Sequence, residues 1–158
     1  MRAEISEPED LGSLEEEWEL DSKFLVFAVG EKEFALKIRY IIEIVPLLPV
    51  TELPNMPDYI LGIVNLRGRG IPVIDARIRF GIESIEYNEK TSIIVLQLDE
   101  SYYGLIVDGV REVITIPQDS IEPAIGFKSM QGDRFVDGLS KSGENVKILL
   151  NIHKVIQV

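Results

Sequence analysis

The chain of 158 residues contains no cysteine and only one histidine. Without cysteine it can form no disulfide, no cysteine-based zinc site and no catalytic thiol, which fits a reducing cytoplasm. His153 alone cannot build a metal cluster, so we expect no metal site and assign this residue a surface or capping role. No apolar run approaches the ~20 residues that a membrane helix needs. The N-terminus also lacks the basic-then-apolar order of a signal peptide.

Basic residues are scarce, with 16 lysines and arginines against 27 aspartates and glutamates and a formal net charge of -11. Such a charge repels phosphates and argues against nucleic-acid binding. Residues 1–23 hold nine acids and two bases, a formal charge of -7 that leaves -4 for the rest. We interpret residues 1–22 as a disordered acidic tail. The helical spacing of Leu11, Leu14 and Trp18 leaves a frayed helix open.

Motifs for catalysis are also missing. The sequence has no Gly-x-Ser-x-Gly, no P-loop and no dinucleotide-binding fingerprint. Asp75, Asp99 and Asp108 follow apolar runs, where capping and turn residues are common. A small carboxylate-based hydrolase therefore stays a remote alternative. We predict a binding protein with no catalytic residue and no cofactor.

Two apolar runs, Ile60–Val64 and Ile71–Ile74, flank a glycine-rich break. This pattern predicts two strands joined by a tight turn, for which Gly68 and Gly70 can supply positive φ angles. Arg67 serves no need of the turn and is the first functional candidate. Its planar guanidinium suits carboxylate recognition in a partner, but it could also pair with a carboxylate of this chain.

Further apolar runs predict strands at 24–29, 33–36, 92–98, 102–107, 110–116, 135–139 and 146–150. Asp75 and Asn151 each precede a predicted short helix, at 76–80 and 152–156. The segment 38–45 mixes helical spacing with β-branched residues, so we expect a helical turn that runs into an extended chain. Four prolines make 46–58 a stiff loop.

The two halves of the chain, about 23–82 and 91–158, resemble each other. A shift of 69 residues aligns Ile41 with Val110 and Glu43 with Glu112, and a shift of 76 aligns the two capping residues. Each half then reads strand, turn, strand, extended segment, loop, hairpin and short helix. Two copies of a small β unit are the economical interpretation, and frequent turns favour barrels over a parallel sheet.

Several motifs together resemble the CheW family of bacterial chemotaxis coupling proteins. They are Phe24-Leu25-Val26-Phe27, Ile42-Glu43-Ile44, Gly62-x-x-Asn65-Leu66-Arg67-Gly68, Ile71-Pro72-Val73-Ile74-Asp75-x-Arg77 and Val107-Asp108-Gly109-Val110. The resemblance implies a mainly β fold over residues 23–158, with two small SH3-like five-stranded β-barrels packed together and short helices. It also implies a cytoplasmic, non-catalytic scaffold adaptor, recruited to membrane receptor arrays without inserting into the membrane. Its partners would be the regulatory domain of the histidine kinase CheA and the cytoplasmic tip of chemoreceptors. A coupling protein of another receptor-kinase pathway is the alternative.

The resemblance also implies roles for individual residues. Arg67 falls on the receptor-facing site, and Ile41, Glu43 and Val110 fall near the receptor groove or the kinase contact. By residue type alone, we expect Glu43 to lie on a solvated face and Ile41 and Val110 to lie in the hydrophobic core. Motif positions with structural roles are Gly62, which would let strands approach closely, and Asn65, Gly68, Asp75 and Gly109. Arg69 departs from the family pattern, where an apolar residue is common.

Overall fold

The computed structural model describes residues 20–124, 134–141 and 145–157. Most of these residues lie in strands, as predicted. The strands are β1 (Lys23–Val29), β2 (Lys32–Lys37), β3 (Ile41–Pro46), β4 (Val50–Thr51), β5 (Ile60–Leu66), β6 (Arg69–Asp75), β7 (Ser92–Leu98), β8 (Ser101–Val107), β9 (Gly109–Thr115), β10 (Val136–Ser140) and β11 (Lys147–Leu150). The helices are α2 (Ala76–Arg79) and α3 (Ile152–Ile156), with 3₁₀ turns at Ile38–Tyr40 and Gln118–Ser120.

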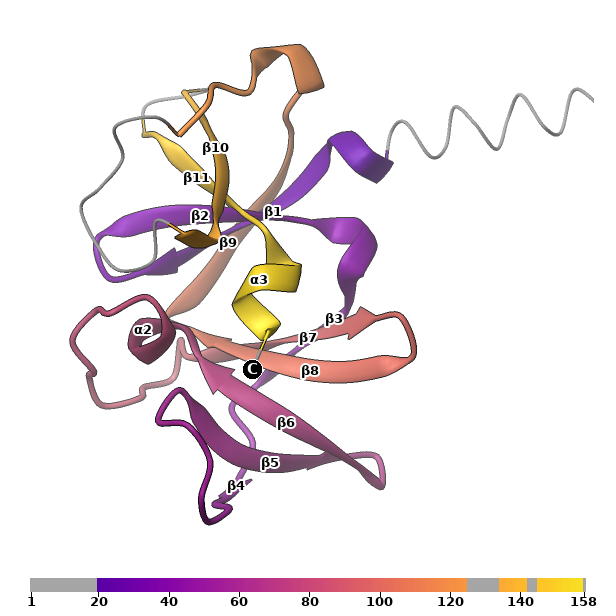
Figure 1. Ribbon diagram of the computed structural model, residues 1–158, viewed down its shortest axis with the longest axis vertical. Coiled ribbons are helices and arrows are strands. Elements are labelled where there is room, and N and C mark those ends of the chain that lie inside the picture. The colour runs from indigo at the N-terminus through magenta and orange to yellow at the C-terminus, as the bar shows by residue number, and fades with distance from the viewer. Residues whose placement is uncertain (1–19, 125–133, 142–144, 158) are drawn as a thin grey trace, which may run out of the picture.

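The strands form two packed sheets. One has the order β10-β11-β2-β1-β9 and the other the order β3-β7-β8-β6-β5-β4. Figure 1 shows the first sheet above the second, with α3 between them. The prediction of two packed β units is confirmed.

The two sheets share one topology but interlace the halves of the sequence. Replacing β1, β2, β9, β10 and β11 by β7, β8, β3, β5 and β6 turns the first strand order into the second, apart from the short β4. Each sheet therefore contains strands from both halves, and neither 23–82 nor 91–158 is a spatial unit. The reason is that β3 pairs with β7 and not with the preceding hairpin of β1 and β2. In the same way, β9 pairs with β1 and not with the preceding hairpin of β7 and β8.

A shared irregularity confirms the repeat at the level of single residues. The pairing of β3 with β7 and the pairing of β9 with β1 each contain one bulge. The residues that the pairing skips are Ile42 and Arg111, which the 69-residue shift relates to each other. Ile41 and Val110, one position earlier, are likewise equivalent. Bulges that recur at equivalent sites indicate that the bend in each edge strand is a structural feature of the repeat.

Close backbone approach explains one glycine of the motif. A Cβ atom on Gly62 would lie 2.1 Å from the carbonyl oxygen of Thr51, so only glycine lets β5 pass β4. The expectation for Gly62 is confirmed. Gly138, 76 positions later, occupies the same place, since its Cβ would lie 2.8 Å from the oxygen of Glu122. Gly109 differs, because a Cβ there would meet only ordinary contact at 3.5 Å.

The two expected β units are open in the described part of the chain and are not fully closed barrels. Within the described ranges, no hydrogen bonds join β3 to β4 or β9 to β10, the edge strands of the two sheets. Residues 47–49 instead connect β3 directly to β4. After β9, Glu122 forms an isolated antiparallel bridge with Leu139 of β10. Prolines at 46, 49 and 117, which lack an N–H group, lie at these corners. β4 itself adds a sixth strand inside the predicted loop.

The continuous apolar runs of β1 and β7 arise because these inner strands are buried on both faces. Along β1, Leu25 and Phe27 face a large core shared by the two sheets and both helices, whereas Phe24 and Val26 face a small core outside it. β7 alternates in the same way between the shared core and a third cluster. Strands buried on both faces show no polar alternation.

Local elements largely follow the sequence predictions. The carboxylate of Asp75 accepts a hydrogen bond from the Ile78 N–H at 3.2 Å, and Asn151 accepts one from Lys154 at 3.2 Å, so both predicted caps are confirmed. The predicted helical turn before β3 is present at Ile38–Tyr40. Residues 20–22 are helical. The rest of the predicted tail lies outside the described residues.

Candidate functional site

The hairpin between β5 and β6 turns at Arg67 and Gly68. Both residues have positive φ angles, 54° and 83°, and Leu66 pairs with Arg69, which defines a two-residue turn of the type that matches strand twist. The side chain of Asn65 accepts a hydrogen bond from the Gly68 N–H at 2.9 Å and stabilises this turn. Asn65 and Gly68 thus have the structural roles expected of them, while Gly70 lies within β6.

Arg67 forms a two-pronged ion pair with Glu43 of β3. Its Nη2 donates to Oε1 at 2.8 Å and its Nη1 donates to Oε2. The hydrogen bond from Arg67 is the main cause that lowers the pKa of Glu43, and the same bond raises the pKa of Arg67. Both groups are therefore charged at neutral pH. Glu43, which its residue type alone places on a solvated face, is half-buried and held by Arg67.

The ion pair leaves much of Arg67 accessible. Its side chain is 70% exposed, whereas that of Glu43 is 26% exposed. A guanidinium has five N–H donors, and Glu43 engages two of its nitrogens. Glu43 consequently orients the arginine, whose outer donors face solvent.

Arg69 has a different environment from Arg67. Its guanidinium stacks on the ring of Tyr102 in β8, 4.2 Å from the ring centroid. A cation over an aromatic face is held electrostatically. The two arginines near the hairpin turn are therefore anchored to different neighbours.

Ile41 and Val110 occupy equivalent edge strands but different environments. Ile41 is half-buried and packs against the shared core, as its residue type alone predicts. Val110 is 38% exposed on β9. The structure brings Glu43 and Arg67 together, while Ile41 contributes mainly to packing.

Sequence reasoning missed the exposed apolar side chains of β3. Ile42 and Ile44 are 47% and 41% exposed and alternate with the half-buried Ile41, Glu43 and Val45. Val113 of β9, the equivalent of Ile44 under the 69-residue shift, is exposed as well. The sequence of 41–46 carries no local signal for this exposure, because alternation would place Ile42 and Ile44 opposite the charged Glu43 and hence on the buried face. Apolar residues are also usually assigned to the core.

Comparison with known proteins identifies the family. A CheW-like domain model matches residues 23–158. The chain belongs to the CheW-like domain family. It is similar to Chemotaxis protein CheW of Klebsiella aerogenes, with 36% identity over 134 residues that cover 85% of this chain and 81% of the relative. It is 35% identical to Chemotaxis protein CheW of Bacillus subtilis over 134 residues, which cover 85% and 86% of the two chains.

A solved structure of the CheW-like family supports the fold. The crystal structure of the scaffolding protein TtCheW from Thermoanaerobacter tengcongensis superposes with a TM-score of 0.80 at 36% identity, covering 87% of this chain and 94% of that one. Across the described ranges of this CheW-like chain, no group of three or more metal-ligating side chains occurs. No helix in those ranges is long and apolar enough to span a membrane.

A polar junction joins the two sheets of this CheW-like domain. Asp108, between β8 and β9, accepts hydrogen bonds from the Gly30 N–H at 2.7 Å and from Arg77 of α2 at 2.8 to 3.2 Å. Burial alone would raise the pKa of Asp108, but the bonds from Arg77 and Gly30 outweigh it and lower the pKa. Nearby, Tyr87 donates to the capping carboxylate of Asp75, and burial with this bond raises the tyrosine pKa.

Asp108→Asn should lower the free energy of unfolding by about 1–3 kcal/mol at pH 7, because it removes a charged acceptor from Arg77. A carboxyl whose pKa is lowered in the folded state stabilises the fold above its unfolded pKa of about 3.9 and loses this effect as the pH falls further. As the pH is lowered from about 5 through the folded-state pKa of Asp108, the parent should therefore lose more stability than the Asp108→Asn variant. Urea unfolding at several pH values measures the difference, and parallel pH profiles would contradict it.

Proposed function

We propose that this chain is a non-catalytic scaffold adaptor that couples chemoreceptors to the histidine kinase CheA in bacterial chemotaxis signalling. Two observations on β3 carry the proposal: the Glu43–Arg67 pair orients an exposed guanidinium, and Ile42 and Ile44 expose apolar side chains on the same edge strand. They lie on a domain whose relatives are named chemotaxis proteins. We infer a cytoplasmic location in a bacterium and recruitment to membrane receptor arrays by these partners.

The chemistry of these side chains suits protein recognition. Exposed isoleucines supply apolar area, and the oriented arginine supplies directional donors for a carboxylate of the partner. β3 is also the edge of its sheet, so one side of its backbone has no neighbouring strand in the described part of the chain. Exposed apolar side chains and an oriented arginine are both features that protein interfaces use.

The repeat offers a second surface for a second partner. β9 is the edge of the other sheet and exposes Val110 and Val113. An adaptor must hold two proteins at once, and two equivalent edges on opposite sheets fit this requirement. We propose the receptor tip and the regulatory domain of CheA as the two partners.

Titration calorimetry with a receptor tip fragment and with the regulatory domain of CheA, separately and together, tests the function. We expect saturable binding of each and a ternary complex in which neither partner displaces the other. Failure to bind both fragments, with the adaptor folded by circular dichroism, would overturn the proposal. Binding only the receptor-kinase pair of another pathway would support the same-fold alternative.

The purified chain should have no catalytic activity of its own. The sequence carries no nucleotide-binding motif and no cysteine, and the described residues include no metal cluster. We expect phosphate release from ATP to equal that of a buffer blank, and no phosphate transfer in the absence of kinase. Hydrolysis that tracks the protein through gel filtration would contradict this expectation.

A further inference from the structure

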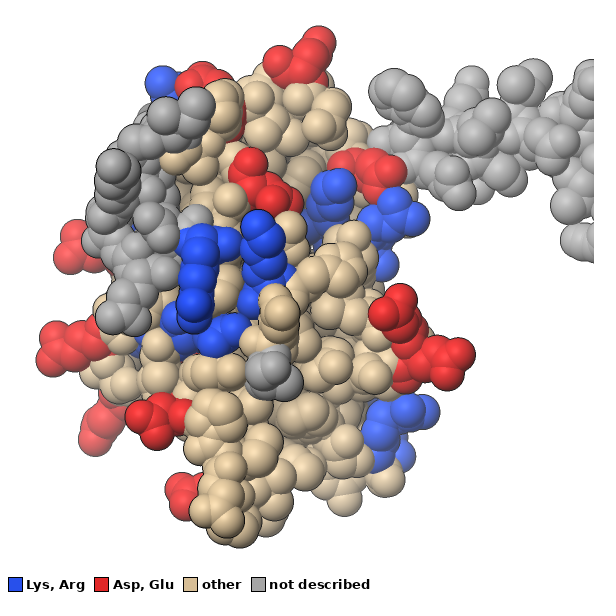
Figure 2. Space-filling model, in the orientation of Figure 1, with Lys and Arg blue, Asp and Glu red and all other residues tan. Residues whose placement is uncertain are grey.

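A strip of basic side chains crosses one face of this acidic protein. It consists of Arg39 beside the 3₁₀ turn, His153 and Lys154 on α3, Arg79 of α2 and Arg134 before β10. Figure 2 shows lysine and arginine side chains gathered over the middle of this face, while most acidic side chains lie nearer its outline. This concentration is unexpected in a chain with a formal net charge of -11.

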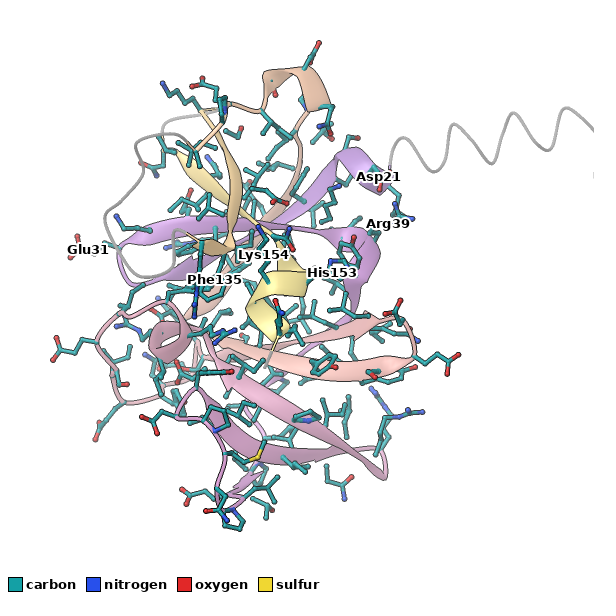
Figure 3. The ribbon with its side chains drawn as sticks, in the orientation of Figure 1. Asp21, Glu31, Arg39, Phe135, His153 and Lys154 are labelled. Carbon is teal, nitrogen blue, oxygen red and sulfur yellow. The ribbon has the colours of Figure 1, made fainter. Side chains whose placement is uncertain are left out.

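The contacts make the strip continuous. Tyr40, next to Arg39, packs edge-on against the ring of His153 at 5.5 Å between centroids. Arg79 donates to the carbonyls of Lys154, Val155 and Gln157 at 3.3, 2.9 and 2.6 Å, which holds it at the end of α3. Arg79 and Arg134 each lie 4.7 Å from the ring centroid of Phe135. Figure 3 shows Arg39, His153 and Lys154 on this side of the molecule, together with the position of the buried Phe135.

In the part of the chain that the structure describes, no acidic side chain neutralises most of the positive charge of the strip. Within the described residues, Lys154 and Arg134 form no ion pair, and the hydrogen bonds of Arg79 go to backbone carbonyls. Arg39 is paired with Asp21, and Asp137 near the strip accepts a hydrogen bond from Asn151 at 3.2 Å. The strip therefore offers cations to an acidic partner.

The acidic N-terminal segment joins the folded chain at one end of this strip. Asp21 forms an ion pair with Arg39, the first member of the strip. Residues 1–19 precede it and hold eight acidic side chains against Arg2. A chain of this length can extend up to about 60 Å, at roughly 3.3 Å per residue, which is enough to reach across a domain of this size.

We propose that residues 1–19 bind the basic strip of their own chain and shield it. The Asp21–Arg39 pair places the segment at the strip, and the opposite charges attract along its length. Single exposed ion pairs are weak, but the covalent tether keeps the effective concentration of the acids in the millimolar range. Any acidic partner of the strip must therefore compete with this segment. The inference does not depend on the proposed chemotaxis function.

The absence of cysteine makes a direct test possible. Ser13→Cys introduces a single thiol into the full chain, where a nitroxide spin label can be attached. We expect the label to reduce the amide NMR signals of Arg39, His153 and Lys154 at least twofold at about 0.01 M salt, where the Debye length is ~30 Å. At about 1 M salt, where the Debye length is ~3 Å, the signals should recover.

Charge variants and a mixed sample complete the test. Arg134→Glu with Lys154→Glu should abolish the effect, whereas the control Lys32→Glu with Lys90→Glu, of equal charge change elsewhere on the surface, should keep it. Replacing Glu15, Glu16, Glu17 and Glu19 by glutamine should abolish it without altering the described fold. The proposal would be overturned if the spin-label effect disappeared in the control variant as well as in the strip variant. It would also be overturned if the effect persisted in the strip variant. In a mixed sample, the ¹⁵N-enriched chain carries no nitroxide and the nitroxide is attached to a second chain without ¹⁵N. Equal signal loss in this sample would also overturn the proposal, because the contact would then come from a second copy.

Discussion

Gly62→Ala should lower the free energy of unfolding by about 3–5 kcal/mol, through overpacking and backbone strain together. The added Cβ would lie 2.1 Å from the carbonyl oxygen of Thr51, 2.8 Å from its carbonyl carbon and 3.0 Å from the Cα of Glu52. All three are backbone atoms, so no side-chain rotation can relieve the clash. β4 must separate from β5, and the corner that carries the chain around this sheet opens.

Urea unfolding at constant m-value measures the loss of stability. The matched control is Gly109→Ala, where the nearest atom would lie 3.5 Å away and the variant should stay within about 1 kcal/mol of the parent. Gly138→Ala should resemble Gly62→Ala, because its Cβ would lie 2.7 Å from Ile121 and 2.8 Å from the oxygen of Glu122. A parent-like midpoint for Gly62→Ala would contradict the close approach of the two strands.

Arg67→Glu should weaken partner binding by about tenfold to a thousandfold, or roughly 1.4–4 kcal/mol. The change removes the exposed donors of the guanidinium and places two carboxylates, at positions 43 and 67, side by side. Folding should be nearly unaffected, since substitutions of exposed side chains usually shift stability by about half a kcal/mol. Arg67→Lys should be intermediate, because it keeps the charge but loses the planar fork. Calorimetry against each partner, with a thermal melt of each variant, measures both effects.

A charge exchange separates two roles of Arg67. Combining Glu43→Arg with Arg67→Glu restores an ion pair across the same positions but moves the guanidinium to β3. If Arg67 contacts the partner, binding should stay weak in the double variant, whereas full recovery would mean that the pair serves only to hold the hairpin. Arg69→Glu provides the same charge change on a side chain that stacks on Tyr102, and it should bind nearly normally.

The sequence predicted the strands well because their physical signal is local. β1 and β7 are continuous apolar runs, and Asp75 and Asn151 precede their helices as capping residues do. β4 escaped prediction because two residues carry no periodicity. Gly138 escaped because its need for glycine comes from Glu122, which lies on a different segment of the chain.

The site was harder to predict because it depends on long-range pairing. Glu43 and Arg67 are 24 positions apart, and no local pattern brings β3 beside the hairpin turn. The exchange of β3 and β9 between the sheets is likewise a property of the whole chain. Ile42 and Ile44 looked like core residues because exposure depends on what lies opposite an edge strand, which the residue type does not encode.

The interlaced topology has a consequence for the origin of the molecule. A half-length ancestor could not complete either sheet alone, since each sheet takes an edge strand and a hairpin from the other half. Two identical copies could complete both sheets by exchanging these elements, as a domain-swapped homodimer does. Joining two such copies through a segment at the position of 83–91 would yield one chain with this strand order, in which the two edge strands need no longer be identical.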